Sequence, residues 1–217
     1  MTYQAILFDN DGVLVDTERL YFQANREILG RAGITLTDAQ YVELFLRTAR
    51  GAWHLLEGSL DEEAIGALRA ERDRRYEELV AAGDVVIPDA PACVASLARR
   101  YRLAIVTSSD PAPFALAHAR SELLRHFELV LTREHYRNSK PDPEPYLTAV
   151  QRLGVAPERC LVIEDSERGL RAAKAAGLAC WVVPSALTGG GRFQDADAVL
   201  DDLAAVSARL LGATSGA

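Results

Sequence analysis

The sequence predicts an α/β protein, in which an α-helical cap domain is inserted into a doubly wound, mostly parallel sheet core. Three observations support this fold class. Short apolar runs recur along the chain, each followed by polar or acidic residues. Helix-like segments separate the later runs, and strand alternating with helix is typical of a parallel sheet covered on both faces. One long interval after the first run carries only helical patterning.

Five apolar runs are the predicted strands. The first is "AILF" (5–8), directly before Asp9. The later ones are "LAIV" before Thr107, "ELVL" before Thr132, "LVI" before Glu164 and "CWVV" before Pro184. The predicted helices between these later runs cover 111–125, 143–153 and 167–176. Ligands of such sheets bind just beyond the C-terminal ends of the strands, so the polar residues after each run are the candidate site.

Residues 16–85 are predicted to form the helical cap, and residues 1–15 and 86–217 the core. The stretches "TERLYFQANREILGRAG" and "LDEEAIGALRAERDRRYEELVAAG" each end in glycine, as a helix C-terminus often does. The alternating charges of the second stretch predict a solvent-exposed helix face. An insertion of this size is large enough to form a lid over the strand ends.

Composition excludes several classes of partner. The formal net charge is -7 and no long basic stripe is present, which disfavours nucleic acid and anionic membrane surfaces. No apolar stretch is long enough to span a bilayer, and the N-terminus lacks the pattern of a signal peptide, so we expect a cytoplasmic protein. The three cysteines form no CxxC pair, which favours buried reduced thiols over metal ligands.

Asp9 and Asp11 are the candidate catalytic residues. Asp9 lies at the tip of the first predicted strand, and Asp11 follows past a turn that Gly12 permits. A carboxylate can attack phosphorus, but an anionic phosphoryl group repels it unless positive charge is near. Two unit charges 4 Å apart interact by roughly 4 kcal/mol at an effective dielectric constant of 20. Mg²⁺ with carboxylate ligands would supply that charge, and Glu164 and Asp165 are predicted to complete its site.

Lys140, Thr107 and Ser108 are the candidate phosphate-binding residues. Lys140 lies in "NSKPDPEPY", where the neighbouring prolines restrict the backbone, and its ammonium group can neutralise both Asp9 and a phosphoryl oxygen. The Thr107 hydroxyl and the amides of Ser108 and Ser109 precede "DP", a predicted helix N-terminus that can cradle an anion. Each motif alone is compatible with an ordinary loop or cap. Their placement at successive strand ends favours one joint site.

Four stretches together resemble the haloacid dehalogenase-like hydrolase superfamily, in its C1 branch, which inserts a helical cap after the first strand of a Rossmann-like core. They are "FDNDGVLVDTE" (8–18), "LAIVTSS" (103–109), "SKPDPEPY" (139–146) and "VIEDSERGLRAAKAAG" (162–177). The cap region is similar to β-phosphoglucomutase-like and phosphoglycolate-phosphatase-like proteins. The resemblance implies an enzyme that uses Mg²⁺.

The resemblance also implies roles for individual residues. Asp9 would be the nucleophile that becomes an aspartyl-phosphate. Asp11 would act as general acid and then base, with its backbone carbonyl on the metal. Thr107 and Lys140 would bind the phosphoryl group. Asp165 would ligate Mg²⁺, and Glu164 would ligate it or hold its surroundings.

The predicted function is a Mg²⁺-dependent phosphatase acting on a small phosphorylated metabolite, such as a sugar phosphate, as a monomer or weak dimer. In the resemblance, Asp11 is typical of phosphoryl-transferring members and is missing from dehalogenases. A sugar phosphomutase is the alternative, although Tyr21 stands where such mutases carry histidine. Arg50, in "LRTARGAW", is a candidate contact for a second anionic group of the substrate.

Two further alternatives stay open at this stage. The stretch "DNDGVLVDTE" approaches the spacing of a calcium-binding loop, but such a loop would begin at Leu7, and a strand precedes it where a helix is expected. A degenerate member of the fold that only binds ligands is also possible. Asn10 is predicted to point away from the site, since successive side chains alternate near a strand end. "TGGGRF" (188–193) lacks the Lys-Ser/Thr of a P-loop and is predicted to be a flexible loop.

Overall fold

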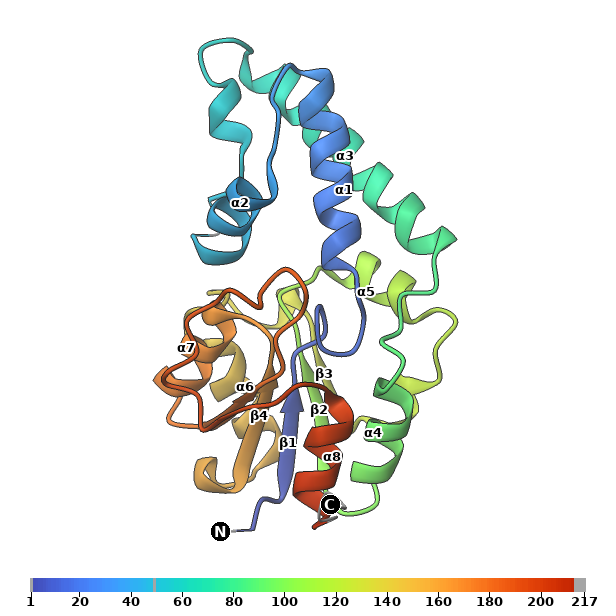
Figure 1. Ribbon diagram of the computed structural model, residues 1–217, viewed down its shortest axis with the longest axis vertical. Helices are drawn as coiled ribbons and strands as arrows, with labels where there is room; N and C mark the ends of the chain where they lie inside the picture. The colour runs from blue at the N-terminus through green and yellow to red at the C-terminus, as the bar shows by residue number, and fades with distance from the viewer. Residues whose placement is uncertain (1, 49, 213–217) are drawn as a thin grey trace. The chain divides into compact units, whose positions relative to one another are not determined.

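The computed structural model describes residues 2–48 and 50–212 (Figure 1). The chain divides into two compact units, a core unit that ends at Asp16 and resumes at Val86, and a cap unit, Thr17–Val85. Asp16, which the sequence interpretation assigned to the cap, therefore groups with the core unit.

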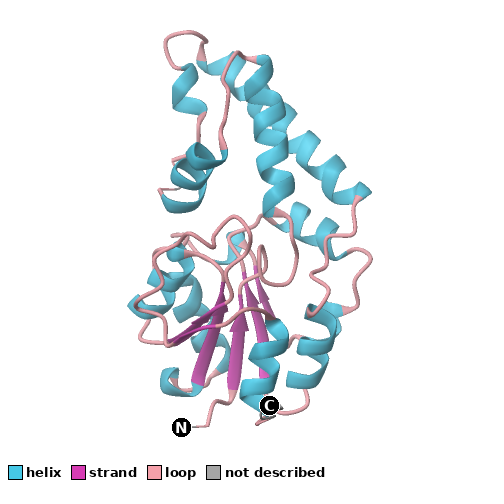
Figure 2. Cartoon of the chain, viewed as in Figure 1, coloured by secondary structure: helices cyan, strands magenta, loops and turns pink. Residues whose placement is uncertain are grey.

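The core unit is built on one parallel sheet of six strands, which confirms the predicted fold class (Figure 2). The strands lie in the order β3-β2-β1-β4-β5-β6. Their bounds are β1 Ala5–Phe8, β2 Arg102–Val106, β3 Leu129–Leu131, β4 Cys160–Glu164, β5 Ala179–Val182 and β6 Ala198–Val199. The chain adds strands outward from β1 on one side and then from β4 on the other. The order reverses between β1 and β4, and ligands of open α/β sheets bind at such a switch point.

Helices cover both faces of this sheet (Figure 1). They are α4 Ala90–Leu97, α5 Pro111–His118, α6 Glu144–Leu153, α7 Glu167–Ala175 and α8 Leu203–Leu211, with short turns of helix η3 Leu123–His126, η4 Arg133–His135 and η5 Pro157–Arg159. Alternate residues of β1 enter opposite cores. Ala5 and Leu7 pack with residues of α6 and α7, whereas Ile6 and Phe8 pack with residues of α4 and α8.

The helix predicted over 111–125 is shorter than expected. It ends at His118, and the backbone N–H of Ser121 donates to the His118 carbonyl in a turn. Strand β6 was missed, because its two residues are too few to give a periodic signal. The three cysteines are buried and unpaired, as the sequence predicts.

The cap unit is helical, with α1 Glu18–Arg31, α2 Asp38–Tyr41, η1 Val42–Arg47, η2 Trp53–Leu56 and α3 Glu62–Ala82. The predicted exposed face of α3 is wrong for Arg72, which is only 8 % exposed. Arg72 shares the buried stripe of Ile65, Tyr76 and Val80, because residues seven and eleven apart return to one helix face. Its guanidinium donates to the Tyr21 hydroxyl and also lies over that ring.

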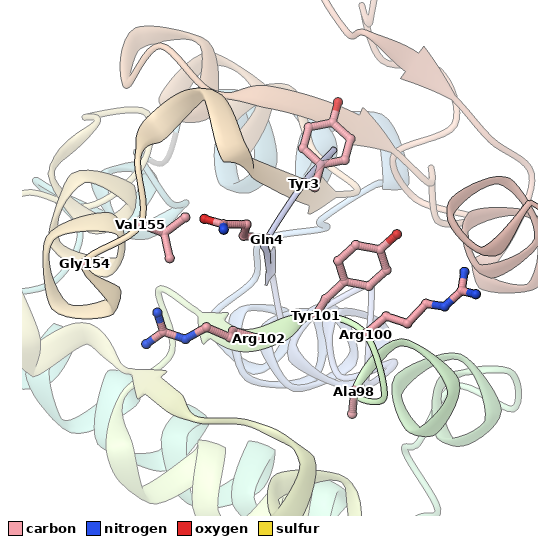
Figure 3. Close-up of a pocket in the computed structure, with 8 residues that line it drawn as sticks. All are labelled: Tyr3, Gln4, Ala98, Arg100, Tyr101, Arg102, Gly154 and Val155. Atoms are coloured by element: carbon pink, nitrogen blue, oxygen red, sulfur yellow. The ribbon is translucent and has the colours of Figure 1, made fainter. Parts of the chain in front are cut away.

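One open hollow of about 500 Å³ lies at the N-terminal ends of β1 and β2 (Figure 3). Its lining residues are Tyr3, Gln4, Ala98, Arg100, Tyr101, Arg102, Gly154 and Val155. Because Asp9 follows the opposite end of β1, this hollow is not where the predicted site residues lie. Within the described residues, no helix is both long and apolar enough to cross a membrane.

Candidate active site

The predicted site residues of the core unit come from the C-terminal ends of adjacent strands. Asp9 follows β1, Thr107 follows β2, and Glu164 ends β4. Lys140 lies in the connection between η4 and α6. Because these parallel strands end at the same edge of the sheet, residues far apart in sequence meet there.

Lys140 is the centre of a buried charge network. Its ammonium group donates to Asp9 Oδ1 at 2.8 Å, to Glu164 Oε1 at 2.7 Å and to the Val106 carbonyl at 2.8 Å. Burial by itself lowers the pKa of this ammonium, but the carboxylates of Asp9 and Glu164 outweigh burial and raise it. All three N–H groups already have acceptors, so a phosphoryl oxygen would share one of them.

Glu164 is fully buried and receives hydrogen bonds on both carboxylate oxygens. Besides Lys140, the Tyr146 hydroxyl donates to Oε1 at 2.6 Å and the Ser166 hydroxyl donates to Oε2 at 3.1 Å. A Cβ atom at Gly169 would lie 1.8 Å from its carboxyl carbon, so only glycine leaves room for this side chain. Burial raises the pKa of Glu164, but Lys140 and these hydroxyls outweigh it and lower the pKa below its usual value.

Asp9 lies in an excess of negative charge. Burial and the neighbouring Glu164 raise the pKa of Asp9 to about 7, against the opposing effect of Lys140. Asp9, Glu164 and Asp165 each place a carboxylate oxygen within 4.8 Å of the others. Carboxylate oxygens are hard ligands, and the negative charge of these three side chains is not fully balanced. Such a group suits a small divalent cation, so these residues fit Mg²⁺.

Gly12 allows Asp165 to reach this cluster. Its φ angle is +83°, in the left-handed region that favours glycine. A Cβ atom there would lie 2.2 Å from Asp165 Oδ2. The glycine predicted to form the turn after Asp9 therefore also makes space for a candidate metal ligand.

Asp11 is held by hydroxyl groups that follow β2. Its Oδ2 accepts from Thr107 Oγ1 at 3.0 Å and from Ser109 Oγ at 2.6 Å. Thr107 Oγ1 in turn accepts the backbone N–H of Ser109 at 3.0 Å. In the part of the chain that the structure describes, the buried Ser108 hydroxyl has no hydrogen-bond partner. Thr107 is thus bound to Asp11 here, and phosphate binding by Thr107 and Ser108 stays a prediction.

Some site residues were missed by sequence reasoning. The sequence predicts a role for the backbone amide of Ser109 but not for its hydroxyl, and it predicts no role for Tyr146. Asn10, predicted to point away from the site, has a fully buried side chain that contacts His118 of α5. Arg50 is exposed and belongs to the cap unit, so its contact with substrate stays a prediction. The strand β1 before the "DNDGVLVDTE" stretch departs from the helix that begins a calcium-binding motif.

Comparison with known proteins decides the family. Residues 3–177 match the model of the haloacid dehalogenase-like hydrolases. The chain belongs to the haloacid dehalogenase-like hydrolase family. The predicted resemblance is therefore confirmed.

Two relatives of this hydrolase are phosphatases by name. It is 32% identical to a phosphorylated carbohydrates phosphatase of Thermotoga maritima, over 81% of this chain and 82% of the relative. It is 31% identical to the fructose-1-phosphate phosphatase YqaB of Escherichia coli, over 81% of this chain and 94% of the relative. The crystal structure of CbbY from Rhodobacter sphaeroides in complex with phosphate aligns with a TM-score of 0.76 and 30% identity, covering 94% and 96% of the two chains. This hydrolase is an enzyme of the phosphoric monoester hydrolase class.

Proposed function

We propose that the protein is a Mg²⁺-dependent phosphatase that hydrolyses a small phosphorylated carbohydrate through an aspartyl-phosphate on Asp9. The observation that carries this proposal is the pairing of Asp9 with the buried ammonium of Lys140, beside a second carboxylate held by Thr107 and Ser109. The substrate class follows from the relatives named for phosphorylated carbohydrates and fructose-1-phosphate.

The proposed reaction has two displacements at phosphorus. Asp9 attacks, an oxygen–phosphorus bond forms, and the bond from phosphorus to the sugar oxygen breaks while protonated Asp11 gives that oxygen a proton. Asp11 then takes a proton from water, which attacks the phosphorus and releases inorganic phosphate from Asp9. Thr107 and Ser109 keep Asp11 oriented through both steps.

Asp9 and Asp165, with the backbone carbonyl of Asp11, would hold the metal. Glu164 is close enough to contribute an oxygen, but its hydrogen bonds favour a role in holding Lys140. Bound Mg²⁺ supplies positive charge that offsets the carboxylates and polarises the phosphoryl group. Lys140 supplies the fixed positive charge beside the nucleophile.

The test is a screen of phosphorylated metabolites for phosphate release, with Asp9→Asn as the blank. We expect release from sugar phosphates that requires Mg²⁺ and stops with a chelator. Appreciable release by a clean Asp9→Asn preparation would refute the assignment. Isomerisation of a sugar phosphate without net phosphate release would instead favour the mutase alternative.

We further propose that the enzyme acts in the cytoplasm as a monomer or weak dimer, on a small molecule rather than on nucleic acid or a membrane. The net charge of -7 supports the choice of a small substrate, since a bound cation can make one local cleft attractive to an anion. Sedimentation velocity at micromolar concentration measures the oligomeric state.

A further inference from the structure

Asn10 lies between the two catalytic aspartates, but its side chain is fully buried and contacts helix α5. Its backbone carbonyl accepts the N–H groups of Val13, Leu14 and Val15 at 3.3, 2.8 and 3.1 Å. Residue 10 therefore fixes the turn after β1 through its backbone and attaches that turn to α5 through its side chain.

His118, the last residue of α5, is the partner of Asn10. Its Nε2 lies 2.7 Å from Asn10 Oδ1, and its Nδ1 lies 3.0 Å from Ser121 Oγ. His118 is 4 % exposed, and its ring packs against Phe114. Burial lowers the pKa of His118 to about 4, although the charge of Asp11 opposes this effect, so the ring is neutral near pH 7.

The chemistry of the two partners assigns the proton on this ring. With the carboxamide oxygen of Asn10 facing the ring, Nε2 carries the hydrogen and donates to it. Among the described residues, the buried Nδ2 of Asn10 has no hydrogen-bond partner. Nδ1 then accepts from the Ser121 hydroxyl. Both ring nitrogens of His118 thus have hydrogen-bond partners inside the core, and these two hydrogen bonds fix the orientation of the ring.

The loop that carries the aspartates is therefore attached to the β2–α5 segment at two points. Asp11 binds the hydroxyls of Thr107 and Ser109, which precede α5, and Asn10 binds the far end of the same helix. These attachments restrict rotation of the backbone between Asp9 and Asp11. A displacement of about 1 Å in an active site can cost on the order of 100-fold in rate.

We propose that Asn10 and His118 form a positioning pair that fixes the directions in which Asp9 and Asp11 present their carboxylates. The pair acts through the backbone of the β1 loop, and neither residue belongs to the candidate metal cluster. The proposal rests on the proposed function, because its consequence is measured as phosphatase turnover.

The experiment compares two variants that remove the hydrogen bond with one that only weakens the core. Asn10→Ala and His118→Phe should each lower kcat by about 10- to 100-fold and leave KM within about threefold, with an unchanged circular dichroism spectrum. Their Mg²⁺ affinity, measured by calorimetry, should also fall. Val206→Ala, in α8 and in the core cluster that includes Phe8 and Phe114, should lose stability but keep its kcat. His118→Gln, whose amide can donate to Asn10, should recover most of the turnover.

The double variant Asn10→Ala/His118→Phe decides whether the two residues act together. Its kcat should equal that of the slower single variant, because one hydrogen bond cannot be lost twice. Three outcomes would overturn the pair. The first is a double variant in which the two losses of kcat multiply, and the second is equal kcat in His118→Gln and His118→Phe. The third is a folded Asn10→Ala variant with wild-type kcat and wild-type Mg²⁺ affinity. If the wild-type enzyme releases no phosphate from any substrate, the proposed function fails, and Mg²⁺ affinity still tests the pair.

Discussion

Lys140 brings a positive charge into a buried site that holds several carboxylates. Its side chain is 3% exposed, and it pairs with Asp9, 12% exposed, and Glu164, 0% exposed. Removing one partner of a buried ion pair leaves the other charge buried and uncompensated, whereas an exposed ion pair contributes little to stability. The contribution of Lys140 to the free energy of unfolding therefore depends more on its burial than on its charge.

Replacing Lys140 with methionine should lower the free energy of unfolding by about 3–5 kcal/mol in metal-free buffer. Lys174→Met is the matched control, because Lys174 pairs with Asp197 at the same 2.8 Å while both side chains are more than one-third exposed. That variant should lose at most about 1 kcal/mol. Urea denaturation measures both values, and equal losses would contradict the argument.

Gly12→Ala should damage metal binding in addition to the backbone. The added methyl would meet Asp165 Oδ2, so we expect Mg²⁺ affinity to fall by at least about 10-fold, or about 1.4 kcal/mol. Gly33→Ala is the control, since its φ of +82° is nearly the same and its Cβ would meet nothing within 4 Å. Both variants should lose about 1–2 kcal/mol of stability from the left-handed backbone. Unchanged Mg²⁺ affinity in Gly12→Ala would exclude Asp165 as a ligand.

At the scale of elements, α5 serves the site from both of its ends. The residues just before it hold Asp11, and its last residue holds Asn10. The helix is short, Pro111–His118, so the same few turns connect both contacts. The neutral state of His118 is part of this connection, because protonation would place an unpaired charge in the core.

Acid should therefore weaken the attachment of α5 in a defined pH range. The pKa of His118 is about 4 in the folded protein and 6.5 in its ordinary state, so between these values the unfolded chain binds a proton that the folded chain does not. The stability from neutral His118 is complete above pH 6.5 and is lost as the pH falls toward 4. Between pH 7.5 and 5 we expect wild type to lose about 2 kcal/mol more than His118→Gln. Parallel losses in chemical denaturation would show that another group is responsible.

At the scale of the whole molecule, the sequence predicts the fold and much of the site for one physical reason. Parallel strands end at a common edge, so polar residues at the ends of apolar runs converge, as Asp9 and Glu164 do around Lys140. The particular partners were not predictable, since Tyr146 and His118 enter through packing between segments far apart in sequence. Burial of Arg72 was missed because the charge pattern of α3 hides its apolar stripe.

Metal binding should stabilise the core unit as a whole. If Mg²⁺ binds only the folded protein, a concentration 100 times its dissociation constant adds about 2.7 kcal/mol to the free energy of unfolding. Asp165→Asn should abolish this gain, whereas the exposed control Asp201→Asn should keep it. Thermal melts with Mg²⁺ and with a chelator give the comparison.

The reversal of strand order between β1 and β4 has a consequence for the chain during synthesis. Asp9 is made first, and Glu164 and Asp165 follow about 155 residues later in the chain. A nascent chain that lacks β4 therefore carries the proposed nucleophile without the other members of the candidate cation cluster. If Asp9 is the nucleophile, activity should appear only after β4 has paired with β1, whereas β5, β6 and α8 follow later in the chain.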